Sequence, residues 1–113
     1  MCNKSQAIEI LGEVYRASEQ IFGNQVKDAY LYGSYARGDY HAESDIDILL
    51  IVDLTQETIS EYRYPVGLIT SDLSLKHDVT VSVTVKAYDQ FCRYADVLPY
   101  YKNVLGEGIR YAS

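Results

Sequence analysis

Residues 45–52 constrain the fold more than any other feature of the sequence. They read Asp-Ile-Asp-Ile-Leu-Leu-Ile-Val, so two acidic residues lead into an apolar stretch. A short apolar run bounded by polar residues is typical of a strand, and its continuous apolar character indicates that both sheet faces are covered. The chain is therefore expected to place other elements on both sides of this strand.

Helical and strand patterns alternate along the rest of the chain. Asn3 and Gln6 are spaced as a capping box, and Gly23 is a suitable C-terminal stop for the helix between them. Valine alternates with polar residues over 78–85, which is the period of a strand with one apolar face. The expected elements are a helix over 5–22, strands over 28–32, 45–52 and 78–85, a helical turn over 35–38, a helix within 55–76 that begins near Pro65, and helices over 87–94 and 99–105.

This order of elements predicts an α/β (α+β) fold in which a small mixed β-sheet has flanking helices. Hydrophobic residues make up 48% of the chain, which is typical of a globular protein. The 113 residues are enough for one core, and no linker divides them. We therefore expect a single domain over residues 1–113.

Charge and composition exclude several classes of function. The net charge is −6 and the pI is about 4.7, which argues against non-specific nucleic-acid binding because an acidic surface repels phosphates. No apolar run is long enough to span a membrane, and the N-terminus does not resemble a signal peptide. Cys2 and Cys92 are too few for a disulfide framework. We therefore expect a cytoplasmic protein with two reduced thiols.

A candidate phosphate-binding turn lies at residues 33–38, directly after the strand expected over 28–32. Backbone N–H groups at the start of a helical turn have no partners and can bind phosphate. Gly33 allows a phosphate to approach the backbone without a Cβ in the way. The hydroxyl of Ser34 supplies a further donor.

Three carboxylates are candidate metal ligands. Asp45 and Asp47 are two residues apart on a strand, so their side chains share one face. Two neighbouring carboxylates repel each other unless a cation neutralises them, and Mg²⁺ binds carboxylates together with phosphates and water. Asp78 opens the strand expected over 78–85 and would reach the same site if the two strands are neighbours. It would then be a second-metal ligand or a general base.

The spacing of these residues resembles a known family. Gly33-Ser34, followed after ten residues by Asp45-Ile46-Asp47, resembles the motif of the DNA polymerase β-like nucleotidyltransferase superfamily. The fuller strings at 33–38 and 44–47 resemble its minimal nucleotidyltransferase branch. Residues 73–79 resemble the run that carries the third acidic residue. The similarity extends from about Ala7 to Tyr111.

The resemblance implies a metal-dependent nucleotidyltransferase. Such an enzyme transfers a nucleoside monophosphate from ATP or another nucleoside triphosphate to a hydroxyl acceptor at a two-metal Mg²⁺ site and releases pyrophosphate, and AMP is the group expected here. Gly33 and Ser34 would hold the β- and γ-phosphates, and Asp45, Asp47 and Asp78 would form the catalytic metal site. The branch often works beside a helical HEPN-type partner as an antitoxin, so the acceptor would be a hydroxyl of that partner.

Two other functions compete with this interpretation. Thr80, Ser82 and Thr84 share a strand face with Asp78, and any of them could take the third acidic position. The chain would then be a binding module that neutralises a helical partner by contact, and an apolar surface near the C-terminus would suit the interface: Tyr94, Leu98, Tyr100 and Tyr101. In the third interpretation, a homo-oligomer modifies a small molecule and the second subunit supplies the acceptor pocket.

The role of single polar and aromatic residues near the motif is open. Arg37 is a candidate for phosphate binding, but it could equally pair with Asp39 or Glu43 and fix the loop. Tyr35 and Tyr40 could stack on a base, although packing is the simpler expectation.

Overall fold

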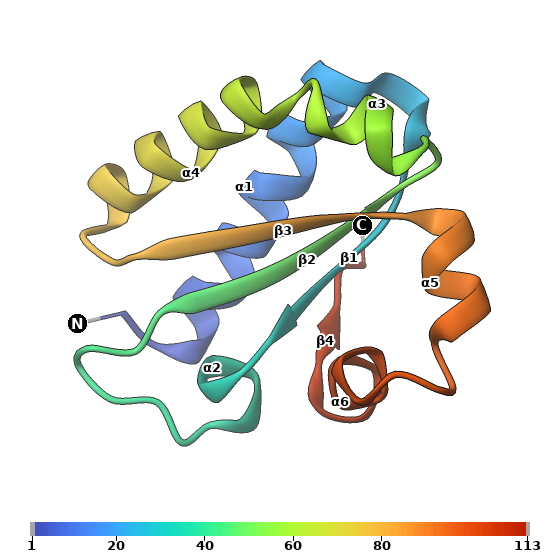
Figure 1. The fold of residues 1–113 in the computed structure, drawn as a ribbon. Coiled ribbons are helices and arrows are strands. Elements are labelled where there is room, and N and C mark those ends of the chain that lie inside the picture. The colour runs from blue at the N-terminus through green and yellow to red at the C-terminus, as the bar shows by residue number, and fades with distance from the viewer. Residues whose placement is uncertain (1, 113) are drawn as a thin grey trace.

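The computed structural model describes residues 2–112 (Figure 1). The elements in chain order are α1 (Lys4–Phe22), a 3₁₀ turn η1 (Gly23–Gln25), β1 (Val26–Tyr32), α2 (Ser34–Arg37), β2 (Ile46–Val52), α3 (Gln56–Ser60), α4 (Arg63–His77), β3 (Val81–Ala87), α5 (Tyr88–Tyr94), α6 (Pro99–Glu107) and β4 (Ile109–Arg110).

The strands form one mixed sheet in the order β3-β2-β1-β4. β1 runs antiparallel to both β2 and β4, whereas β2 runs parallel to β3. β2 is therefore an interior strand, and its Ile46 and its residues 48–52 are completely buried. The expected α/β class with a small mixed sheet is confirmed, and the apolar run does lie at the centre of the sheet.

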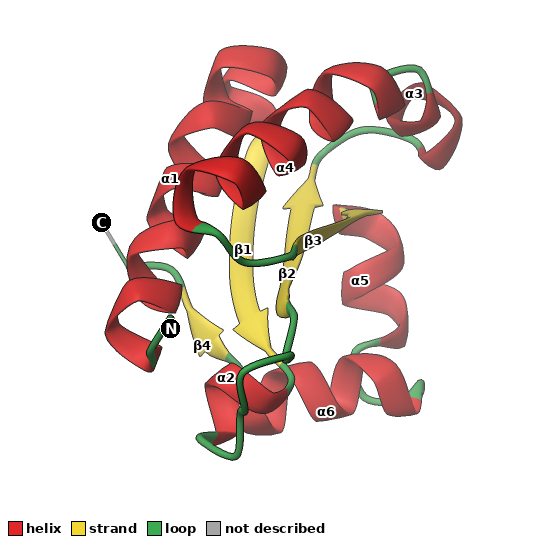
Figure 2. Cartoon of the chain, turned by 90° about the vertical axis from the view of Figure 1, so that its left-hand side faces the viewer, coloured by secondary structure: helices red, strands yellow, loops and turns green. Residues whose placement is uncertain are grey.

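Helices cover both faces of the sheet (Figure 2). α1 and α4 pack on one face, where α1 contributes its buried stripe to the main core: Ala7, Ile10, Leu11 and Val14. α5 and α6 lie on the other face, where Tyr101 and Val104 pack on Leu49 and Ile51 of β2. The second face is covered mainly toward the end of β2, so the start of this strand remains accessible there.

The first helix follows its sequence signals. Asn3 accepts a hydrogen bond from the Gln6 N–H and Gln6 reciprocates, so the expected capping box is present. The helix ends at Gly23, whose φ of 61° suits glycine.

Three expectations need correction. The helix expected to begin near Pro65 is present as α4, and Pro65 lies in its first turn, where its missing N–H removes no helical hydrogen bond, but the short helix α3 before it was not expected. β4 was not expected, because two residues carry no periodic pattern. β3 begins at Val81 rather than at residue 78, because α4 continues to His77.

Across residues 2–112, no helix combines the length and the apolar character needed to cross a membrane.

Candidate functional site

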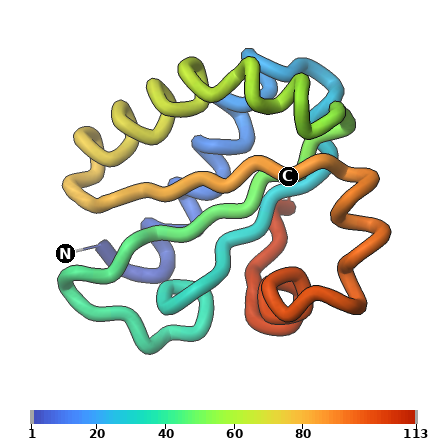
Figure 3. Tube along the Cα trace, viewed as in Figure 1, coloured from blue at the N-terminus to red at the C-terminus, as the bar shows by residue number. Residues whose placement is uncertain are grey.

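The candidate site is built on one row of residues across the sheet. Tyr32 of β1 pairs with Asp47 of β2, and Asp47 pairs with Ser82 of β3. Residues directly opposite on neighbouring strands present their side chains on the same face. This row lies at the end of the sheet where β1 ends and β2 begins. The loop between α2 and β2 leads away from the sheet before the chain enters β2 (Figure 3).

Gly33 brings the backbone directly beside a carboxylate. Its φ of 79° and ψ of −157° lie in a region that is essentially restricted to glycine. A Cβ built on Gly33 would lie 2.5 Å from the Oδ2 atom of Asp47. The turn and the acidic motif therefore lie side by side, and a side chain at position 33 would displace the carboxylate of Asp47.

The turn after Gly33 presents free backbone donors. The Ala36 and Arg37 N–H groups donate to the Gly33 carbonyl, and the Gly38 N–H donates to the Ser34 carbonyl. Within the described chain, the N–H groups of Ser34 and Tyr35 have no hydrogen-bond acceptor. Two donors beside a carboxylate that can hold a cation form a suitable environment for a phosphate.

The carboxylates of Asp45 and Asp47 differ in their surroundings. Asp45 is exposed and Asp47 is half-buried. Burial raises the pKa of Asp47, the charge of Asp45 raises it further, and the guanidinium of Arg37 offsets part of this effect. A divalent cation beside Asp47 would relieve the same cost of burial and repulsion.

The residues present fit one Mg²⁺ better than two. Asp45 and Asp47 offer carboxylate oxygens, the ligands that Mg²⁺ prefers, and phosphate and water oxygens can complete its coordination. In residues 2–112 there is no group of three or more His, Cys, Asp or Glu side chains arranged for metal binding. A second ion would therefore lack the carboxylate that the expected two-metal site requires.

The structure does not bring Asp78 to this site. Asp78 caps the C-terminus of α4 in the left-handed conformation, with φ 51° and ψ 48°, and its N–H donates to the Ser74 carbonyl. Aspartate tolerates this conformation better than most residues do. The expectation that Asp78 opens the strand is thus wrong, because the helix takes this residue as its cap and β3 starts three residues later.

Ser82 occupies the position opposite Asp47. Thr84 lies on the same face as Ser82, two residues further along β3, and is opposite Leu49. Thr80 precedes β3, and its carbonyl accepts from the Ile46 N–H. Of the four candidates for the third acidic position, the one that faces Asp47 across the sheet carries a hydroxyl.

Arg37 pairs with two exposed carboxylates. Its Nε lies 3.2 Å from Asp39 and its Nη1 lies 3.2 Å from Glu107. The expected alternative partner, Glu43, instead donates its backbone N–H to the Nδ1 atom of His41. The Arg37 side chain is 44% exposed, so it remains accessible from the site.

Aromatic side chains near the motif pack against each other. Tyr35 is buried and stacks on Tyr40 with ring centroids 4.4 Å apart, so packing explains both residues. The Tyr100 hydroxyl donates to the Tyr32 hydroxyl at 3.0 Å, and burial raises the pKa of Tyr100. Tyr100 thereby closes the face of the sheet beside the Tyr32–Asp47–Ser82 row.

The apolar surface expected near the C-terminus is only partly exposed. Tyr101 is buried under α6, and Tyr100 is partly buried against Tyr32. Tyr94, Val97 and Leu98 are exposed, between the end of α5 and the start of α6. Leu98 and Tyr94 thus remain candidates for an interface, together with Val97.

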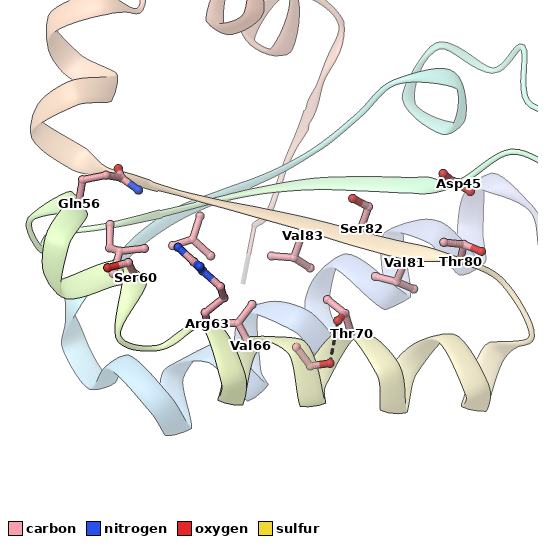
Figure 4. Close-up of a pocket in the computed structure, with 13 residues that line it drawn as sticks. Asp45, Gln56, Ser60, Arg63, Val66, Thr70, Thr80, Val81, Ser82 and Val83 are labelled. Carbon is pink, nitrogen blue, oxygen red and sulfur yellow. Dashed lines mark hydrogen bonds between the residues drawn. The ribbon is translucent and has the colours of Figure 1, made fainter.

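Two hollows flank the acidic pair. The first, of about 260 Å³, is lined by the candidate phosphate-binding turn and by α6: Tyr32, Gly33, Arg37, Tyr100, Asn103, Val104 and Glu107. The second, of about 540 Å³, starts at Asp45 and Ser82 and extends between β3 and α4 to Arg63 and Gln56 (Figure 4). Arg63 and Glu107 carry no local signal in the sequence, because only the tertiary fold brings α4 and α6 to the two sides of the motif.

The chain matches a family model and curated relatives over most of its length. Residues 11–110 match the model described as nucleotidyltransferase domain. A protein of Methanocaldococcus jannaschii, named as a putative protein adenylyltransferase, is 35% identical over 106 residues, covering 94% of this chain and 95% of the relative. A second protein of that organism and name is 38% identical over 77 residues, covering 68% and 76%.

Solved structures share the fold. A crystal structure described as a toxin-antitoxin with AMP-PNP aligns with a TM-score of 0.57 and 20% identity, over 90% of this chain and 72% of the other. A tri-AMPylated Shewanella oneidensis HEPN toxin in complex with MNT antitoxin aligns with a TM-score of 0.53 and 17% identity, over 97% and 72%. At these identities the likeness establishes the architecture.

Proposed function

The chain belongs to the nucleotidyltransferase domain family, and on that premise we propose that it transfers AMP from ATP to a protein hydroxyl. The contact of Gly33 with Asp47 is the observation that carries this proposal. It joins a turn with free backbone donors to an acidic pair, and a metal–triphosphate needs both.

Each residue of the site has a separate task. The backbone N–H groups of Ser34 and Tyr35 and the Ser34 hydroxyl bind the β- and γ-phosphates. Asp45 and Asp47 hold Mg²⁺, which neutralises charge on the phosphates when it is bound. Arg37 lines the same hollow, and its ion pairs with exposed carboxylates are weak enough for a phosphate to compete for the guanidinium.

The transfer itself is a substitution at the α-phosphorus. The acceptor oxygen attacks this atom and forms the new P–O bond. The bond between the α-phosphorus and the bridging oxygen of the β-phosphate breaks, and pyrophosphate leaves with the electron pair. The proton of the acceptor hydroxyl passes to solvent. Ser82, and not a carboxylate, lies opposite Asp47, and among the described residues no third carboxylate joins Asp45 and Asp47.

The names of relatives and neighbours support a protein acceptor. The curated relatives carry the name protein adenylyltransferase, and one structural neighbour is in complex with a HEPN toxin that is itself AMPylated. We therefore propose a helical HEPN-type partner as the acceptor and an antitoxin role for this chain. ATP and Mg²⁺ follow from the same proposal.

Ser82 favours a second candidate function. Without a third carboxylate, the site lacks a general base and a second-metal ligand at the position opposite Asp47. A chain with this site could retain nucleotide binding and neutralise its helical partner by contact alone. Tyr94, Val97 and Leu98 would then contribute to the contact surface.

Mass spectrometry separates the two functions. A candidate HEPN-type partner protein is incubated with the chain, ATP and Mg²⁺, and an Asp47→Asn variant is the control. A mass gain of one or more AMP units that is absent with the variant supports transfer. A stable complex without a mass gain contradicts transfer and supports the binding module.

A further inference from the structure

We propose that the free edge of β3 docks an extended segment of the acceptor protein, which pairs with the backbone of Val83 and Val85 and places an acidic side chain on Arg63. The inference rests on the proposed AMP transfer, and it identifies where the acceptor approaches the site and what chemistry it carries.

The edge of β3 has free hydrogen-bonding groups at its centre. The Thr80 carbonyl accepts from Ile46 of β2, and backbone groups alternate in direction along a strand, so odd-numbered residues of β3 direct theirs away from the sheet. At the two ends of this edge, side chains satisfy the backbone. The Val81 N–H donates to the Ser74 hydroxyl and the Ala87 N–H donates to the Gln56 carbonyl oxygen.

Val83 and Val85 remain between these two capped positions. Within the described residues, the N–H groups of Val83 and Val85 on the outer edge of β3 donate to no backbone acceptor. An unpaired row of this kind is a template for an added strand. A partner segment can therefore form backbone hydrogen bonds at Val83 and Val85, and Ser74 and Gln56 limit the length of the pairing.

A groove lies directly below this edge. Its apolar wall consists of Val81, Val83 and Val85 from β3, with Val66 and Ile59 from α4 and α3. Figure 4 shows Val81 and Val83 directed toward α4, whereas Ser82 is directed the other way. An extended segment that pairs with β3 directs every second side chain into such a groove.

Gly67 contributes to the width of the groove. It lies inside α4, where glycine weakens a helix relative to alanine. A Cβ at this position would have nothing within 4 Å, so packing does not require glycine there. The missing side chain instead leaves space on the groove wall.

The order of the strands places the acceptor on this side. Pyrophosphate leaves from the Gly33 turn at the end of β1, and the reacting phosphorus lies at the acidic pair of β2. Attacking and leaving oxygens are roughly in line in phosphoryl transfer. The attacking hydroxyl must therefore come from the opposite side of β2, which is the side of β3.

Arg63 defines the charge of the docked segment. Its guanidinium lines the far end of the groove and has no ion-pair partner within residues 2–112. The acidic pair at the near end excludes a carboxylate there. Val85 lies about 10 Å along the strand from Ser82 and on the opposite face, so the acidic residue of the segment is about three positions from the hydroxyl residue and is directed to the other face.

Peptide binding to the whole chain, followed by amide NMR, tests the proposal. The probes are two acetylated and amidated peptides of serine, threonine and valine around one tyrosine, with glutamate or lysine about three positions from it on both sides, so that the charge and the tyrosine point to opposite faces. We expect shifts of the Val83 and Val85 amides, and about threefold or stronger preference for the glutamate peptide. Shifts confined to other surfaces would overturn the proposal.

Variants of the groove give the matched comparisons. Val83→Pro removes an outward N–H, which an edge strand tolerates, and should weaken binding of both peptides about tenfold. Arg63→Glu should reverse the charge preference. Arg16→Glu, the same change at an exposed arginine of α1, should leave it unaltered. Undiminished binding by both groove variants would contradict docking on β3, and unchanged spectra elsewhere would show that they fold.

The outcomes distinguish this inference from the proposed transfer. Peptide binding at β3 without AMP incorporation supports the docking surface and counts against transfer. AMP incorporation at equal rates with Val83→Pro and Arg63→Glu supports transfer and overturns docking. If AMP-PNP alone shifts the Val83 and Val85 amides and Val83→Pro abolishes its binding, the groove is a nucleoside site and the proposal fails.

Discussion

Gly33 is the residue whose replacement tests the geometry of the site most simply. A Gly33→Ala change combines a conformation that alanine rarely adopts with a contact against Asp47. We expect a loss of about 1–3 kcal/mol in the free energy of unfolding and loss of AMP-PNP binding. Urea unfolding and isothermal titration measure the two effects.

Gly106→Ala is the matched control for Gly33→Ala. Gly106 lies inside α6, and a Cβ there has nothing within 4 Å. This change should stabilise the helix by about 0.5–1 kcal/mol and leave AMP-PNP binding unchanged. Equal behaviour of the two variants would contradict the argument that position 33 is closed to side chains.

Ser82 can be converted into the carboxylate that the site lacks. Without metal, Ser82→Asp places like charges opposite each other and should lower the free energy of unfolding by about 0.5 kcal/mol. Mg²⁺ should then raise the melting temperature more than it does in the unaltered chain. Ser82→Asn keeps the size without the charge and should show no added response to Mg²⁺. An identical response of both variants would place Ser82 outside the metal site.

At the scale of elements, α1 and α4 are joined by charged side chains. Glu13 lies 3.2 Å from both Lys76 Nζ and His77 Nε2. Burial raises the pKa of Glu13, but the hydrogen bonds and charges of His77 and Lys76 together lower it below its ordinary value. Because the folded pKa is lowered, this stabilisation is present above the ordinary pKa and is lost as the pH falls through the folded value.

Glu13→Gln tests this linkage. At pH 7 the variant should lose about 1 kcal/mol in the free energy of unfolding, and the difference should vanish in acid. Glu9→Gln, on the same helix and without an ion pair in the described chain, should have no such effect. A difference that is constant with pH would indicate lost packing instead of lost charge.

The elements also show how far the sequence predicts the fold. The capping box of α1 and the apolar run of β2 are local signals, and both elements were found from them. The alternation over 78–85 continues through Asp78, although Asp78 caps α4, so the pattern predicts the strand but places its start too early. A two-residue strand such as β4 has no local signal and depends on its partner, β1.

The candidate site was less predictable than the fold, for a physical reason. Gly33 and Asp47 lie close together in the sequence, so their spacing forms a motif that a family resemblance could identify. The residue opposite Asp47 depends on the register of two strands that are separated by α3 and α4. A shift by one residue moves every side chain to the other face, so the sequence left four candidates for that position.

The whole molecule presents three connected regions on and beside the accessible part of the sheet. The turn at Gly33, the acidic pair and the edge of β3 follow one another across the strand order. This order supports a reaction in which the leaving group, the reacting phosphorus and the acceptor are bound side by side at these three regions. We therefore predict that the chain and the proposed partner break one defined bond of ATP.

The position of a phosphate label tests that claim most directly. The chain and the proposed HEPN-type partner are incubated with Mg²⁺ and with ATP labelled at either the α- or the γ-phosphate, and Asp47→Asn is the control. We predict that the partner takes up the α-label only, that the γ-label is released as pyrophosphate, and that the variant transfers neither. Uptake of the γ-label, or equal uptake of the α-label with the variant, would contradict AMP transfer at this site.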